Sequence, residues 1–160
     1  MAQKITPFLW FDKEALEAAK LYTSIFNSAP GSSKNSKINN EENYKDTPSG
    51  EIQIVTIVLD GQEFILMNAG PTFKFNEAIS FIIDCKDQQE VDYFWNKLIS
   101  DGGEESQCGW LKDKFGVSWQ VLPKQLSELM AKDKSGKVMQ AMLKMHKIVI
   151  KDLEKAYAGK

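Results

Sequence analysis

The stretch CGWLKDKFGVSWQVLP, residues 108–123, gathers several side chains that can do chemistry. Cys108 is a candidate nucleophile, Asp113 a candidate acid or base, and Gln120 a lone amide on an apolar strand. A thiol nucleophile needs a neighbouring base or a depressed pKa. No histidine stands near Cys108 in the sequence, so we expect an inert thiol. Trp119 alternates with Gln120 along the predicted strand and is expected to pack in the core.

Gln120 is the residue that a binding site would use. Its carbonyl and NH2 groups both need partners if the strand faces inward. A ligand is one such partner; a buried polar neighbour such as Asn68 or Ser80 is the other. Trp110 and the loop GPTFKFNE supply aromatic surface, typical of a pocket mouth or equally of a dimer contact. The candidate ligand-binding residues are therefore Asn68, Phe75, Ser80, Trp110 and Gln120.

Other side chains give weaker indications of catalysis. Glu63, Glu77 and Asp113 stand near predicted strand ends, where each is either an acid–base group or a solvated charge. The single histidine, His146, lies among lysines and is expected at the surface or in packing. The chain has no GxG motif, so the glycine-rich turn of common S-adenosylmethionine enzymes is absent.

The composition is that of one globular domain. The chain has 160 residues, 42% hydrophobic and 26% charged, with a net charge of −2. This balance argues against nucleic acid as a partner, because phosphate binding needs a basic face. No apolar run approaches the roughly 18 to 20 residues that span a membrane, and no secretory signal is recognisable. Cys85 and Cys108 form no CxxC pair, so we expect reduced thiols and a cytoplasmic protein.

The chain contains one structural unit twice. Residues 5–26 align with residues 78–99 without a gap, and each segment passes from an apolar run into an amphipathic helix. The second helix carries one apolar stripe of 3.6-residue period, made of Val91, Phe94, Trp95, Leu98 and Ile99. Asp87 is its predicted N-cap, with Glu90 completing a capping box. Asp12 is the predicted cap of the first helix.

Strands follow each predicted helix. The run IQIVTIVLDGQEFILMN reads as two strands joined by a hairpin turn at Asp60-Gly61. The polar segment before it holds at most one edge strand, near residues 37–44. The corresponding strands of the second copy are predicted near 104–108, 110–112 and 118–122, and helices follow around Leu126–Met130, Val138–Met145 and Ile150–Tyr157. The class is α+β, with two β-α-β-β-β modules and a C-terminal helical appendage.

Several motifs resemble one known family. ITPFLWFD, LDGQEFILMNAGPTFKFNEAISF, QCGWLKDKFGVSWQVLP and the ending AMLKMHKI…LEKAYAG are similar to the PhnB-like family of the vicinal oxygen chelate superfamily. That superfamily includes glyoxalases, bleomycin resistance proteins and extradiol dioxygenases, and the PhnB-like family often carries the label 3-demethylubiquinone-9 3-methyltransferase. The resemblance implies a single glyoxalase-like domain over residues 1–160. Its modules would span 4–70 and 77–123 and curl into an open eight-stranded cup, with helices over 124–160 and assembly as a homodimer.

The resemblance also carries over a set of metal-ligand positions. Metal enzymes of this superfamily place their ligands on the first and last strands of each unit. Here those positions fall at Ile5 or Thr6, Ala78, Asn68 and Gln120. The set has no histidine or carboxylate, and neutral amides are poor ligands by themselves. We therefore expect neither a catalytic metal nor another cofactor.

The expected function is that of a glyoxalase- or bleomycin-resistance-like binding protein. It would hold a small, partly apolar molecule in the cavity of the sheet, without nucleic acid or membrane partners. Two alternatives stay open from the sequence: an enzyme of the vicinal oxygen chelate superfamily, of lyase, isomerase or dioxygenase type, and the methyltransferase that the family label names.

Overall fold

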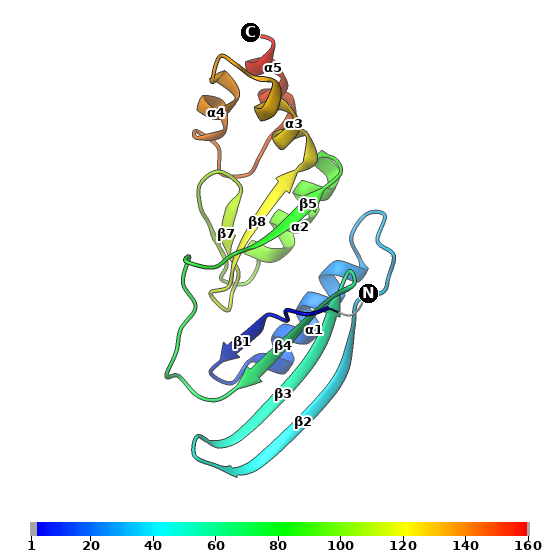
Figure 1. Cartoon of the computed structure of the whole chain (residues 1–160), viewed down its shortest axis with the longest axis vertical. Coiled ribbons are helices and arrows are strands. Elements are labelled where there is room, and N and C mark those ends of the chain that lie inside the picture. The colour runs from blue at the N-terminus through cyan, green and yellow to red at the C-terminus, as the bar shows by residue number, and fades with distance from the viewer. Residues whose placement is uncertain (1–2, 160) are drawn as a thin grey trace. The chain divides into compact units, whose positions relative to one another are not determined.

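The computed structural model describes residues 3–159, which form two compact units with the boundary between Phe75 and Asn76 (Figure 1). The elements run in the order β1 (Phe8–Phe11), α1 (Ala15–Asn27), β2 (Lys37–Thr47), β3 (Gly50–Leu59), β4 (Gln62–Asn68), β5 (Phe81–Cys85), α2 (Gln88–Ile99), β6 (Glu104–Glu105), β7 (Trp110–Lys112), β8 (Ser118–Pro123), α3 (Lys124–Lys132), α4 (Lys137–Met142) and α5 (Ile150–Tyr157). No helix in this described part is both long and apolar enough to span a membrane. The predicted α+β class and the repeated β-α-β-β-β order are confirmed.

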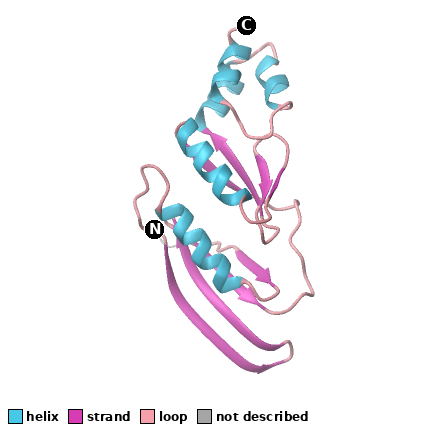
Figure 2. Ribbon diagram, turned by 180° about the vertical axis from the view of Figure 1, so that it is seen from behind, coloured by secondary structure: helices cyan, strands magenta, loops and turns pink. Residues whose placement is uncertain are grey.

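The first unit is a four-stranded mixed sheet with α1 against one face (Figure 2). The strand order is β1-β4-β3-β2, with β1 parallel to β4 and the other pairs antiparallel. Asp60 and Gly61 have φ values of 46° and 88°, the left-handed backbone that a two-residue hairpin requires. The predicted hairpin is therefore confirmed. The predicted edge strand is also present as β2, and it extends to Thr47.

The start of α1 corrects one prediction. Asp12 is not its cap: the helix begins at Ala15, and the N-cap position falls on Glu14, whose side chain makes no capping bond. The Ala15 amide instead donates to Asn68 Oδ1 at 2.7 Å. An orphan amide at a helix start needs an acceptor, and here a side chain 53 positions away supplies it. Such a long-range partner leaves no local signature in the sequence.

The second unit repeats the arrangement, with strand order β5-β8-β7-β6 and α2 on one face (Figure 2). Asp87 caps α2 as predicted, because its Oδ1 accepts the Glu90 amide at 2.9 Å. The return bond of the capping box differs from the prediction. Glu90 Oε2 accepts the Lys86 amide at 2.6 Å, one residue before the cap. One contact satisfies an amide of the first helical turn, that of Glu90, and the other satisfies the Lys86 amide ahead of the helix.

The three C-terminal helices form a small core of their own. Leu126, Val138, Ile148 and Leu153 are buried together, and Leu122 of β8 packs against this cluster. The predicted helices are confirmed, although α4 ends at Met142 rather than Met145. The segment before α5 pairs with the loop before β7: Cys108 and Gly109 donate their amides to the carbonyls of Met145 and His146, both at 2.8 Å. These bonds fix the loop that leads into Trp110.

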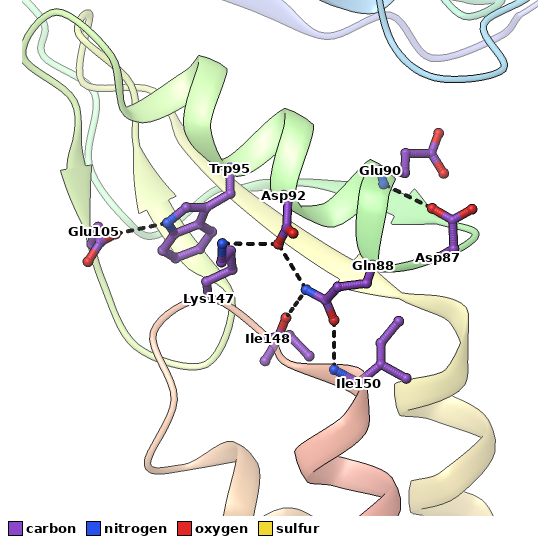
Figure 3. A network of polar contacts seen from close by, with 9 residues as sticks. All are labelled: Asp87, Gln88, Glu90, Asp92, Trp95, Glu105, Lys147, Ile148 and Ile150. Atoms are coloured by element: carbon purple, nitrogen blue, oxygen red, sulfur yellow. Dashed lines mark hydrogen bonds and ion pairs between the residues drawn. The ribbon is translucent and has the colours of Figure 1, made fainter.

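Gln88 ties the same segment to α2 (Figure 3). Its Nε2 donates to the Ile148 carbonyl and to Asp92 Oδ1, both at 3.0 Å. Its Oε1 accepts the Ile150 amide at 2.8 Å, which caps α5, since the N-cap residue itself makes no side-chain bond. Lys147 adds an ion pair with Asp92 at 3.0 Å. One amide side chain thus joins a helix start to the unit's main helix.

Replacing Gln88 by alanine is expected to lower the free energy of unfolding by about 1–3 kcal/mol, because part-buried backbone groups at Ile148 and Ile150 lose their partners. Urea unfolding measures the loss, and hydrogen exchange at the Ile150 amide should accelerate. Gln89→Ala is the matched control, since Gln89 is exposed on the same helix. Equal effects of the two substitutions would contradict the capping role of Gln88.

Candidate functional site

The second sheet has α2 on one face. Its other face carries a row of three residues, of which two are predicted site residues and the third is their neighbour on β5. Gln120 on β8 pairs with Ile82 on β5 and with Trp110 on β7. Residues paired across strands point to the same face, and their neighbours in sequence point to the other. Trp119 accordingly lies on the α2 side and is 2% exposed, so its predicted core role is confirmed. We call the face that carries Ile82, Gln120 and Trp110 the open face.

Gln120 uses only part of its amide within the protein. Its Nε2 donates to Ser80 Oγ at 2.9 Å. The sequence left open whether a ligand or a polar neighbour partners this amide, and Ser80 is such a neighbour. Within residues 3–159 the carbonyl oxygen of Gln120 has no hydrogen-bond partner, although Gln120 is only half-buried. The acceptor side of this amide is thus available to another molecule.

Apolar surface flanks Gln120 on both sides. Ile82, the second residue of β5, is 57% exposed, which is unusual for an isoleucine in a strand. Trp110 is half-buried on the other side. Its backbone is fixed by bonds from its amide to the Gln107 carbonyl at 3.0 Å and from the Ser106 amide to its carbonyl at 2.9 Å. A polar pair between apolar walls has the composition of a small-molecule contact surface.

The other two predicted site residues lie in the first unit and serve its packing. Asn68 Oδ1 accepts the Ala15 amide, and its Nδ2 donates to Gln53 Oε1 at 3.2 Å. Phe75 packs edge-on against Phe11, with ring centroids 5.0 Å apart. The structure therefore brings Ser80, Trp110 and Gln120 together on the open face. Asn68 and Phe75 are engaged in contacts within the first unit.

Asp113, a predicted acid–base candidate, is a structural carboxylate. It is 3% exposed. Its Oδ1 accepts the amides of Phe115 and Val117 at 2.9 and 3.0 Å, and its Oδ2 accepts Trp119 Nε1 at 2.9 Å. The D-K-F-G motif is thus a turn folded around its own aspartate, and this carboxylate is occupied by the turn and by the core tryptophan.

The remaining carboxylate candidates are less buried. Glu77 forms an ion pair with Lys112, and this hydrogen bond lowers the pKa of Glu77 and raises that of Lys112. A general acid at neutral pH needs the opposite shift for a carboxyl group. Glu63 is half-buried at the start of β4, where the Gln3 side chain bonds to its backbone amide and carbonyl. The lowered pKa of Glu77 is therefore not that of a tuned catalytic acid.

The predicted reduced thiols and the predicted surface position of His146 are confirmed. Both cysteines are free thiols: Cys85 is buried, and Cys108 is half-buried. Burial raises the pKa of the Cys85 thiol to about 12. His146 is exposed. Across residues 3–159, no three His, Cys, Asp or Glu side chains gather in a way that would hold a metal ion.

Iodoacetamide at mildly alkaline pH is expected to label Cys108 in the native protein and to spare Cys85. Alkylation requires an accessible thiolate, and Cys85 is 1% exposed with a strongly raised pKa. Peptide mass spectrometry before and after denaturation in urea measures both sites. Equal labelling of the two thiols in the folded protein would contradict the buried position of Cys85 on β5.

The fold places the chain in a known structural class. The fosfomycin resistance protein FosX from Listeria monocytogenes matches with a TM-score of 0.54 and 14% identity, over 80% of this chain and 96% of its own. Glyoxalase I from Leishmania major matches with a TM-score of 0.53 and 14% identity, over 82% and 94%. The chain therefore has the glyoxalase, or vicinal oxygen chelate, fold. At these identities the likeness concerns the fold alone.

Sequence similarity assigns the chain to a family within this structural class. A PhnB protein from Bacillus cereus is 32% identical, with a TM-score of 0.64, over 76% of this chain and 99% of its own. The sequence model of the 3-demethylubiquinone-9 3-methyltransferase family matches residues 3–122. The chain belongs to this family, and the predicted PhnB-like assignment is confirmed. No match was found among curated protein sequences.

Proposed function

We propose that the chain binds a small, partly apolar organic molecule on the open face of the second sheet, without a catalytic metal. The observation that supports this proposal most is the Gln120–Ser80 pair, which lies beside the exposed Ile82 and the half-buried Trp110 and keeps an unused carbonyl acceptor. Homodimer formation and a cytoplasmic location remain part of the proposal by analogy with the superfamily.

The positions that metal enzymes of this fold use do not fit a divalent ion here. Ala78 has no ligating side-chain atom. The same is true of Ile5; its neighbour Thr6 has a hydroxyl that accepts a bond from Gln3 at 3.4 Å. The amide oxygen of Asn68 accepts a bond from Ala15, and its amide nitrogen donates to Gln53. Divalent metals in catalytic sites rely on imidazole, thiolate or carboxylate donors, so the chemistry of these residues favours direct binding of an organic ligand.

An enzyme of the same superfamily is the second candidate. It is favoured by the names of relatives such as glyoxalase I and by the transferase name of the family. The carboxylates argue against it, since Asp113 is committed to a turn and the pKa of Glu77 is lowered. The methyltransferase activity in the family name has less support, because the sequence lacks the glycine-rich turn that common S-adenosylmethionine enzymes use.

A fragment screen followed by two-dimensional NMR tests the proposal. We expect some amphipathic fragments to shift the side-chain amide of Gln120 and the indole N–H of Trp110. Gln120→Leu should lower the affinity for these fragments by about tenfold, because the amide acceptor is lost. Gln89→Leu, on the exposed side of α2, should leave them unchanged. A screen in which no fragment perturbs the open face would refute the proposal.

A further inference from the structure

Ser118 is a buried hydroxyl without a partner. It lies on β8 two residues before Gln120, so both side chains point to the open face. Ser118 is 2% exposed, and its Oγ has no hydrogen-bond partner within residues 3–159. A buried polar group in this state opposes folding, and native proteins retain few of them. Its presence on the face that carries the candidate site calls for a functional reason.

The neighbours of Ser118 are hydrogen-bond donors. Lys112 on β7 is its cross-strand partner. Ser80, one residue before β5, accepts from Gln120 and so keeps its own hydroxyl proton for another acceptor. Ser80, Ser118 and Lys112 thus form a second row beside the row of Ile82, Gln120 and Trp110. Three donors in one row match a ligand oxygen that carries negative charge.

Lys112 already holds a carboxylate, that of Glu77. The side chains of Lys112 and Glu77 are 37% and 58% exposed, and exposed ion pairs are weak and easily exchanged. The lowered pKa of Glu77 keeps the carboxylate ionised at neutral pH. Glu77 therefore shows which chemical group this ammonium accepts, and a ligand carboxylate can replace it at little cost.

We propose that Ser118, Ser80 and Lys112 form a carboxylate-binding subsite, and that the ligand is a small amphipathic carboxylic acid. Its carboxylate takes the place of Glu77 at Lys112 and accepts the hydroxyl protons of Ser118 and Ser80. Its apolar part lies along Ile82 and Trp110, which flank Gln120 in the neighbouring row. This inference rests on the proposed binding function and names the ligand class for the same face.

Matched acids and amides test the charge preference. Phenylacetate, indole-3-acetate and hexanoate are titrated against their primary amides, with the Trp110 indole N–H as the NMR reporter. We expect the acids to bind about tenfold more tightly than the amides, because charge-assisted hydrogen bonds are roughly twice as strong as neutral ones. Glu77→Gln should raise the affinity for the acids and leave that for the amides unchanged, since it removes the competing carboxylate.

Ser118→Ala distinguishes a ligand-binding role of this hydroxyl from a purely structural one. It removes an unsatisfied buried hydroxyl, so the Tm should rise by about 2–4 °C. The affinity for the acids should fall by about tenfold at the same time. Ser36→Ala is the matched control: Ser36 is also buried, but its Oγ accepts the Asp60 amide at 3.0 Å, so its loss should lower the Tm and leave binding unchanged.

The outcomes distinguish the two proposals. If amides bind at Trp110 as tightly as acids, or if Ser118→Ala leaves acid binding intact, the carboxylate subsite is refuted and the binding function stands. If neither the acids and amides nor any fragment in the wider screen perturbs Trp110 and Gln120, both proposals fail. Tighter binding of acids that is lost in Ser118→Ala supports both.

Discussion

Asp113→Ala is expected to destabilise the second unit by roughly 3–5 kcal/mol. The carboxylate accepts the amides of Phe115 and Val117 and the indole N–H of Trp119, and all of these donors lie in or next to the core. Removing it leaves each donor without its acceptor in a site that is 3% exposed. Urea unfolding followed by tryptophan fluorescence measures the loss.

Asp113→Asn gives a more specific version of the same test. One amide oxygen replaces Oδ1 for the two backbone donors, but the NH2 group then faces the Trp119 indole N–H, so two donors meet. The expected loss is about 1–3 kcal/mol, smaller than that of alanine. Asp84→Ala, at an exposed strand position, is the control and should stay within about 0.5 kcal/mol of the wild type. A catalytic aspartate with no structural role would instead tolerate both changes at position 113.

Gly109→Ala is expected to destabilise the second unit by roughly 2–4 kcal/mol. Gly109 is buried, with φ +84°, and a Cβ there would lie 2.7 Å from Leu122 Cδ2, 3.0 Å from the Val121 carbonyl oxygen and 3.2 Å from Ile148 Cγ1. The Val121 amide also donates to the Gly109 carbonyl at 2.8 Å, so the backbones have little freedom to separate. Thermal and urea unfolding measure the effect.

Gly50→Ala isolates the two causes of that loss. Gly50 has the same φ of +84°, but a Cβ there meets nothing within 4 Å. Its substitution should therefore show only the backbone strain, about 1–2 kcal/mol. The difference between the two variants reports the close packing around Gly109. Equal losses would mean that Leu122, Val121 and Ile148 do not pack closely around Gly109.

The architecture was readable from the sequence because it depends on local patterns. The aligned copies at residues 5–26 and 78–99, the stripe on α2 and the Asp60-Gly61 turn are features of period and turn chemistry. The cap of α1 was not readable in the same way. Its acceptor, Asn68, comes from β4, and only the packed fold brings it to Ala15.

The candidate site was readable only in part, for a similar reason. Strand alternation separated Gln120 from Trp119, and the structure agrees. Ile82 and Ser118 were missed as site residues because their relation to Gln120 depends on register and burial, which a single sequence does not define. The shared parity of positions 118 and 120 was the one signal that pointed to Ser118. The resemblance predicts Asn68 as a site residue because it falls at a ligand position of the superfamily, whereas its amide atoms bond to Ala15 and Gln53 within the first unit.

The most direct test of the central claim is an NMR titration with and without EDTA. The binding fragments are added to labelled protein, and the Trp110 indole and Gln120 side-chain amide signals are followed. Direct hydrogen bonding to the open face predicts the same shifts and the same Kd in both conditions. Shifts that disappear in the chelator would show that a metal ion holds the ligand, and would contradict the account.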